Sequence, residues 1–256
     1  MNSKKIYIGI GMIVIIFTLF TLYFAFNYKP EFFTIVTDPS FKATFTNKKW
    51  NRILDDIHLL DKGYDVYDET GYIGNYNLTH LSKANKWYVY TDKMAEVKKI
   101  GEIIGIKSNM KYEIKDMIEK EVTIEDKNII KNELEMKKMK TNYDLAVYQT
   151  YEVDLDNNKE KDKIIVSNLY QSIQNNSDAY SIIVIKIKDK VYTLYYDGNL
   201  KDDSMMTVYA NIKFVFNLKK DDIIEMIITA NSFGQSKSCT SLYEIYDDGP
   251  LLKVNC

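Results

Sequence analysis

The longest hydrophobic run in the chain covers residues 6–26, without a charged residue, a proline or an amide side chain. About 20 apolar residues in an α-helix cross the hydrocarbon core of a bilayer. The run therefore predicts a transmembrane helix. The alternative, a cleaved signal peptide, has a shorter apolar region and small residues before the cut. The bulky residues around Ala25 favour an uncleaved signal anchor.

The charges that flank this run predict its direction. Lys4 and Lys5 lie in the five residues before it, whereas Lys29 after it is followed by Glu31. Positive charge collects on the cytoplasmic side of membrane helices. We therefore expect a single-pass protein of the cell membrane with residues 1–5 in the cytoplasm and the rest of the chain extracellular.

Residues 27–42, which contain two prolines, predict a short stalk, and residues 43–142 a mixed α/β membrane-proximal domain. Helical spacing of five apolar residues predicts an amphipathic helix across 47–60: Trp50, Ile53, Leu54, Ile57 and Leu60. Alternating runs at 63–68, 71–79 and 86–92 predict strands. Thr123 and Asp126 match a capping box that opens a helix to about Lys138; a strand at Lys120–Asp126 is the alternative.

From residue 143 to 256 the pattern changes to short β-branched or aromatic runs separated by acidic or Asn/Gly turns. Such spacing is typical of an antiparallel β-rich domain. The fold class expected is therefore α+β: a transmembrane helix, a mixed α/β region and a C-terminal β domain.

Part of the β region is duplicated. A shift of 63 residues aligns 154–165 with 217–228, so that oxygen side chains at 154, 158 and 162 match those at 217, 221 and 225, and an Ile-Ile pair follows in both copies. A pair of strands trails each copy. The pattern predicts a two-fold repeat of a loop-plus-strands unit.

The first copy of the loop contains the one motif with chemistry in it. Oxygen-bearing side chains stand at alternate positions: Asp154, Asp156, Asn158, Glu160 and Asp162. Ca²⁺ takes six to eight oxygen ligands, which such a loop can wrap around it. The loop is not an EF-hand, because Ile165 stands where that loop needs a bidentate glutamate. The alternative is a solvated turn, since Asp and Asn favour turns without a metal.

An Asp-x-Asp-x-Asn loop that enters a strand, repeated with a hairpin after it, resembles the calcium-loop repeats of the FG-GAP/VCBS type. The closer resemblance is to single-span surface proteins of low-GC Gram-positive bacteria that carry such a domain. It implies side-chain ligands from Asp154, Asp156, Asn158 and Asp162, a backbone carbonyl ligand from Glu160, and no enzyme activity. Lys159 stands where the pattern has glycine, and Lys219 replaces a ligand in the second copy. Two units cannot close a propeller, so we expect a sheet or sandwich.

The two cysteines, Cys239 and Cys256, flank two β-like runs around an Asp-Asp-Gly-Pro turn. Symmetric pairing about that turn sets Tyr246 opposite Leu251 and brings Cys256 within a residue or two of Cys239. The geometry predicts a disulfide in an oxidising exterior, with two free thiols as the alternative.

Composition narrows the function. The net charge is −2, and without Lys4, Lys5 and Lys29 residues 30–256 carry −5. This lacks the basic footprint of a nucleic-acid binder. The two histidines, His58 and His80, make a poor zinc site without a nearby cysteine, and no nucleophile elbow, phosphate loop or dinucleotide fingerprint is present.

These patterns favour a non-enzymatic, membrane-anchored extracytoplasmic binding or scaffolding protein with a Ca²⁺-stiffened loop. Its partner is a protein or a cell-wall ligand. The alternatives are a cell-wall-active hydrolase, which needs paired carboxylates in a cleft, and an accessory subunit of a membrane complex.

Overall fold

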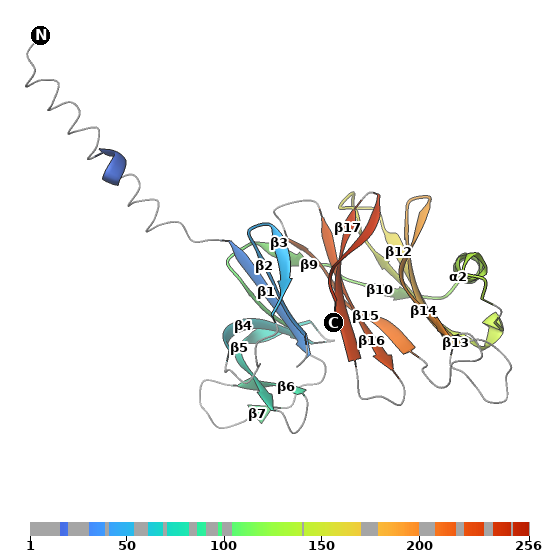
Figure 1. The fold of residues 1–256 in the computed structure, drawn as a ribbon, viewed down its shortest axis with the longest axis horizontal. Helices are drawn as coiled ribbons and strands as arrows, with labels where there is room; N and C mark the ends of the chain where they lie inside the picture. The colour runs from blue at the N-terminus through green and yellow to red at the C-terminus, as the bar shows by residue number, and fades with distance from the viewer. Residues whose placement is uncertain are drawn as a thin grey trace, which may run out of the picture.

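A computed structural model describes residues 16–19, 31–38, 41–53, 61–68, 71–81, 86–90, 97–98, 104–139, 141–169, 179–199, 208–218, 223–232, 238–246 and 248–255. These residues form three antiparallel sheets and a helix, α2 (Ile124–Met136) (Figure 1). Of the expected membrane segment only 16–19 are described, and they are helical; the remainder of 6–26 lies outside the described residues. No helix within the described ranges is long and apolar enough to cross a membrane.

The three sheets are named here by position. The N-terminal sheet has the order β3-β2-β1-β8-β4-β5-β6-β7, the central sheet β18-β17-β16-β15-β9, and the outer sheet β10-β11-β12-β13-β14. The strands of the N-terminal sheet are β1 (Phe32–Asp38), β2 (Phe41–Thr46), β3 (Lys49–Arg52), β4 (Asp61–Asp68), β5 (Gly71–Leu81), β6 (Lys86–Tyr90), β7 (Val97–Lys98) and β8 (Ile104–Ser108).

The strands of the central sheet are β9 (Tyr112–Ile114), β15 (Val208–Leu218), β16 (Ile224–Ser232), β17 (Ser238–Tyr246) and β18 (Gly249–Val254). Those of the outer sheet are β10 (Ile118–Lys120), β11 (Val147–Val153), β12 (Asp162–Leu169), β13 (Ala179–Ile187) and β14 (Lys190–Asn199). A 3₁₀ turn, Tyr143–Leu145, precedes β11. Each of these two sheets therefore consists of a short edge strand followed by a four-stranded meander, as the predicted two-fold repeat requires.

The central sheet is buried on both faces. One face packs on the outer sheet through residues such as Met226 and Ile183. The other packs on the N-terminal sheet, where Phe216 stacks on Phe33 with ring centroids 5.2 Å apart. Strands covered on both sides read as continuous apolar runs rather than as alternating ones, which explains the sequence IEMIITA in β16.

Helix α2 covers the free face of the outer sheet, where Ile130 and Leu134 are fully buried. The predicted capping box is confirmed: the Asp126 N–H donates to Thr123 Oγ1 and the Thr123 N–H to Asp126 Oδ2. Asp126 is fully buried and also accepts a 2.9 Å contact from Lys163 Nζ on β12. Burial raises the pKa of Asp126, but the Thr123 N–H and the Lys163 ammonium outweigh it and hold the pKa below its usual range.

The helix expected across 47–60 is wrong where the structure describes it. Residues 41–52 form the hairpin β2–β3, with Phe45 opposite Trp50. Asn47 and Lys48 both take positive φ, 52° and 62°. Two consecutive left-handed residues make the two-residue turn whose twist matches a hairpin. Trp50 therefore packs beside Phe45 on one sheet face, and residues 54–60 lie outside the described ranges.

Two other expectations about the N-terminal half need correction. Residues 32–38, expected in a stalk, form β1, because Phe33 and Ile35 alternate into the core. The division at residue 142 does not follow the sheets, since β9 pairs with β15 and β10 with β11. The region 43–142, expected to be mixed α/β, holds β3–β10 and the helix α2, although its described elements up to residue 108 are all strands. The predicted strands at 63–68, 71–79 and 86–92 are confirmed as β4, β5 and β6.

Candidate functional site

The predicted calcium loop connects β11 to β12 at one end of the outer sheet. Val153 and Asp162 face each other as the last pair of the ladder, and residues 154–161 bulge beyond it. The loop turns sharply because Asn157 and Lys159 take positive φ, 57° and 73°. Position 159, where the family pattern has glycine, is thus in a conformation that glycine adopts without strain.

Three of the five predicted ligands come together. Asp154, Asp156 and Asp162 each bring a carboxylate oxygen within 4.8 Å of the other two. The side chain of Asn158 is exposed, and Glu160, which is expected to contribute its backbone carbonyl, adds no carboxylate to the cluster. The Asn158 amide closes the turn instead: its Nδ2 donates to Asp156 Oδ2 over 3.0 Å, and its Oδ1 accepts the Glu160 N–H over 2.6 Å.

Asp162 is the fixed member of the carboxylate cluster and is only 5% exposed. Its Oδ2 accepts the Leu155 N–H over 2.8 Å, and its Oδ1 accepts the Lys188 N–H, from the β13–β14 turn, over 3.4 Å. Burial raises the pKa of Asp162, the neighbouring carboxylates of Asp156 and Asp154 add to the rise, and the two backbone N–H groups oppose it. The ionised carboxylates of the cluster therefore repel one another, and a bound cation would reduce this repulsion.

Asp154 has an unmet acceptor. Its Oδ2 accepts the Lys159 N–H over 3.2 Å, but its Oδ1 is buried and has no hydrogen-bond partner. A buried polar atom without a partner costs on the order of 1–3 kcal/mol. In a Ca²⁺ site, this oxygen would be a ligand instead.

Two lysines that the sequence analysis did not single out contact the cluster. Lys188 Nζ lies 2.8 Å from Asp156 Oδ2, and Lys115 Nζ lies 3.8 Å from Asp154 Oδ2. Lys188 also has a positive φ of 54°. The pair Lys188-Asp189, between two strong strand patterns, is the sequence feature that could have predicted this turn. Nothing in the local sequence places Lys115, which lies between β9 and β10, beside residue 154.

The arrangement suits a hard cation. Three carboxylates each bring one oxygen within 4.8 Å of the other two, and oxygen is the donor type that Ca²⁺ prefers. The two ammonium groups offset part of the negative charge, and Lys188, whose side chain is 62% exposed, can swing into solvent. The residues present therefore fit Ca²⁺, with Asp154, Asp156 and Asp162 as the side chains that would hold it.

The second copy of the loop repeats one contact of the first. Glu225 Oε2 accepts the Leu218 N–H over 3.2 Å, as Asp162 does for Leu155, at the same seven-residue separation. Phe216 faces Glu225 as Val153 faces Asp162. Both acids are buried. Both contacts occupy positions 63 residues apart, so the repeat seen in the sequence is also a repeat of structure.

Cys239, on β17, is disulfide-bonded. The chain has one other cysteine, Cys256, which lies outside the described residues. The expected register of this hairpin is wrong by two residues, because Tyr246 pairs with Gly249 rather than Leu251. A two-residue turn closes the hairpin more tightly, and a bulge between Leu242 and Tyr243 then shifts the pairing by one residue.

Comparison with protein families, with curated proteins and with solved structures gives no match. The resemblance to calcium-loop repeats therefore stays an expectation that depends on the loop itself.

Proposed function

We propose that this protein is a membrane-anchored extracytoplasmic binding or scaffolding module whose outer sheet is stiffened by Ca²⁺. The observation that carries the proposal is the buried, unpartnered Asp154 Oδ1 beside two further carboxylates within 4.8 Å. Membrane attachment is inferred from the apolar run at 6–26 and its flanking charges.

The bound ion acts on the joints between strands. Asp154 directly follows β11, Asp162 begins β12, and Asp162 also accepts the N–H of Lys188 in the β13–β14 turn. A cation that holds these carboxylates together thus fixes β11, β12 and the β13–β14 turn relative to one another at one end of the outer sheet. A stiff surface suits a protein that presents a binding face on a tether, because ordering that face in advance lowers the entropic cost of binding.

The test compares thermal unfolding of the full chain in detergent micelles in excess Ca²⁺ and in chelator. A ligand bound only by the native state adds about 2.7 kcal/mol to the free energy of unfolding at a hundredfold excess over Kd. We expect Ca²⁺ to raise the melting temperature of the wild type and to leave that of Asp156→Ala unchanged.

The matched control is Asp189→Ala, which removes an exposed carboxylate from the neighbouring β13–β14 turn. This variant should keep the full Ca²⁺ response. Identical wild-type melting curves in Ca²⁺ and in chelator would show that the loop is a turn without a cation and would overturn the proposal.

A further inference from the structure

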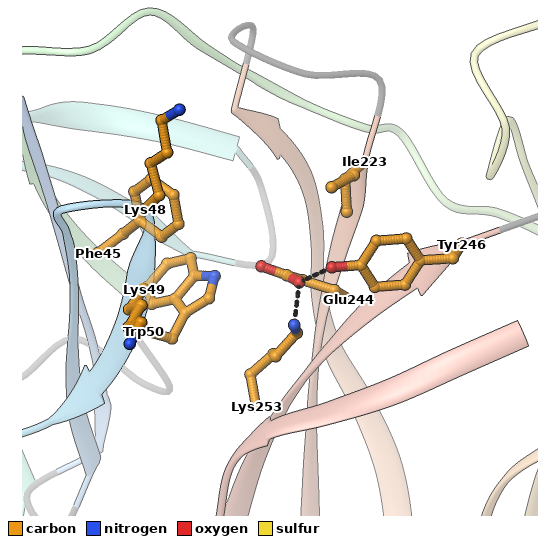
Figure 2. Close-up of a pocket in the computed structure, with 8 residues that line it drawn as sticks. All are labelled: Phe45, Lys48, Lys49, Trp50, Ile223, Glu244, Tyr246 and Lys253. Atoms are coloured by element: carbon orange, nitrogen blue, oxygen red, sulfur yellow. Dashed lines mark hydrogen bonds and ion pairs between the residues drawn. The ribbon is translucent and has the colours of Figure 1, made fainter.

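A second concave site lies where the N-terminal sheet meets the central sheet. A groove of about 440 Å³ separates the β2–β3 hairpin from the β17–β18 hairpin. Figure 2 shows the residues that line it: Phe45, Lys48, Lys49, Trp50, Ile223, Glu244, Tyr246 and Lys253. The calcium loop shares none of these residues, so the groove is a separate candidate.

The wall formed by the hairpin β2–β3 has an unmet donor. Trp50 is 8% exposed, and its Nε1 is buried without a hydrogen-bond partner. In Figure 2 the indole nitrogen points across the groove toward Glu244. Buried tryptophan N–H groups ordinarily find a partner, so this one is suited to meet an acceptor that enters the groove.

The opposite wall has an acceptor to spare. The Glu244 side chain is 8% exposed, and its Oε2 contacts Lys253 Nζ at 2.7 Å and accepts the Tyr246 hydroxyl. Lys253 also lies over the Tyr246 ring, 5.3 Å from its centroid. Among the described residues Oε1 of Glu244 has no hydrogen-bond partner, and in Figure 2 it points toward Trp50.

The described residues that line the groove carry more positive than negative charge. Lys48 and Lys49 are exposed at its rim, and neither forms an ion pair with an acidic side chain in the part of the chain that the structure describes. With Lys253 they make three lysines against one carboxylate, Glu244, among the described residues that line the groove, whereas the whole chain carries −2. This excess favours an anionic ligand.

We propose that this groove binds an acidic sugar, either a uronate or a sugar phosphate. One sugar hydroxyl accepts from Trp50 Nε1 and donates to Glu244 Oε1, because a hydroxyl is both donor and acceptor. The positive charges of Lys48 and Lys49 at the rim attract the acidic group of the ligand. An inorganic anion held at the lysines leaves Trp50 and Glu244 without the bridging sugar hydroxyl, and a neutral sugar leaves the lysines unpaired.

The test follows the fluorescence of Trp50. The chain has two tryptophans, so the full chain with Trp87→Phe, in detergent, reports on Trp50 alone. It is titrated with glucuronate, glucose 6-phosphate, glucose and inorganic phosphate. We expect a saturable change with at least one acidic sugar, and binding at least tenfold weaker for glucose and for inorganic phosphate; the two acidic sugars distinguish carboxylate from phosphate.

Two lysine variants in the same background serve as a matched pair. Lys49→Ala, at the exposed rim, should weaken binding of the acidic sugar at least tenfold, and Lys190→Ala, exposed on the outer sheet, should leave it unchanged. Calorimetric titration of the wild type checks the affinity without fluorescence. The proposal is overturned if neither acidic sugar binds, if inorganic phosphate binds as tightly as the sugars do, or if both lysine variants behave alike.

Discussion

The two copies of the loop share one side-chain-to-backbone hydrogen bond but differ in the first residue of the loop. In both, an acid at the start of a strand accepts the N–H of a leucine seven residues earlier. The first loop opens with Asp154 and the second with Asn217. The Asn217 amide donates to the Ile223 carbonyl over 3.1 Å, whereas Asp154 Oδ1 has no partner.

This difference separates structure from ligand binding. At the 63-residue spacing, Asn217 corresponds to Asp154 and Ile223 to Glu160. In the second copy the Asn217 amide donates to the Ile223 carbonyl. In the first copy the Asp154 carboxylate and the Glu160 carbonyl are both acceptors, so no such hydrogen bond can form between them. A cation can take the place of that N–H, since carboxylate and carbonyl oxygens are its usual ligands. The acid shared by both copies therefore has a structural role, and we propose that the acid at the first position of the loop makes copy one dependent on a cation.

The largest effect is expected at the shared acid. Asp162→Ala leaves the N–H groups of Leu155 and Lys188 unsatisfied and should lower the free energy of unfolding by about 3 kcal/mol. Glu225→Ala removes the partner of Leu218 N–H and should cost about 2 kcal/mol. Urea unfolding in Ca²⁺ and in chelator measures both. Only Asp162→Ala should lose the Ca²⁺ response; loss of that response in Glu225→Ala would break the distinction between the copies.

An exchange at the first position of each loop tests the role of the cation. Asp154→Asn should make the first loop resemble the second, so that stability in chelator is at least that of the wild type and the Ca²⁺ gain, about 2.7 kcal/mol at a hundredfold excess over Kd, disappears. The reverse change, Asn217→Asp, should lower stability by about 1–2 kcal/mol because Ile223 loses its donor. Both are read from thermal melts. A full Ca²⁺ response in Asp154→Asn would contradict the assignment.

The smallest effect is expected at the left-handed residue of the first loop. Lys159→Gly removes the strain of a positive φ, about 1 kcal/mol, against a smaller entropic cost of glycine. We expect a gain of about 0.5 kcal/mol in urea unfolding, with tighter Ca²⁺ binding because a positive charge leaves the loop. Lys161→Gly removes an equal charge without relieving a positive φ and should lower stability. If both variants respond alike, charge alone accounts for the effect.

The sequence predicted those parts of the molecule that depend on local patterns. Each β run from Val147 onward is a strand, and the capping box of Thr123 and Asp126 opens a helix. The repeat was visible because its loop contacts run between residues only seven apart. Three of the five predicted ligands gather for the same reason, since a short loop between paired strands brings its own side chains together.

What the sequence did not predict depends on long-range packing. The apolar spacing around Trp50 also fits a helix, and the turn at Asn47 and Lys48 decides against it. The three-residue strands β9 and β10 have no pattern of their own, because their positions come from pairing with distant strands. The groove at Trp50 was missed for the same reason, as its two walls lie almost 200 residues apart in the chain.

The pairing of distant strands also sets the order in which parts of the fold can form during synthesis. β9 pairs with β15, about a hundred residues later in the chain, and the N-terminal sheet is covered by the central sheet, including Val254 near the end of the chain. During synthesis the aromatic face of the N-terminal sheet, including Phe33, is therefore covered only after the strands of the central sheet have been made. A truncation that removes β18 takes Val254 from this cover, whereas Phe216 of β15 still packs on Phe33.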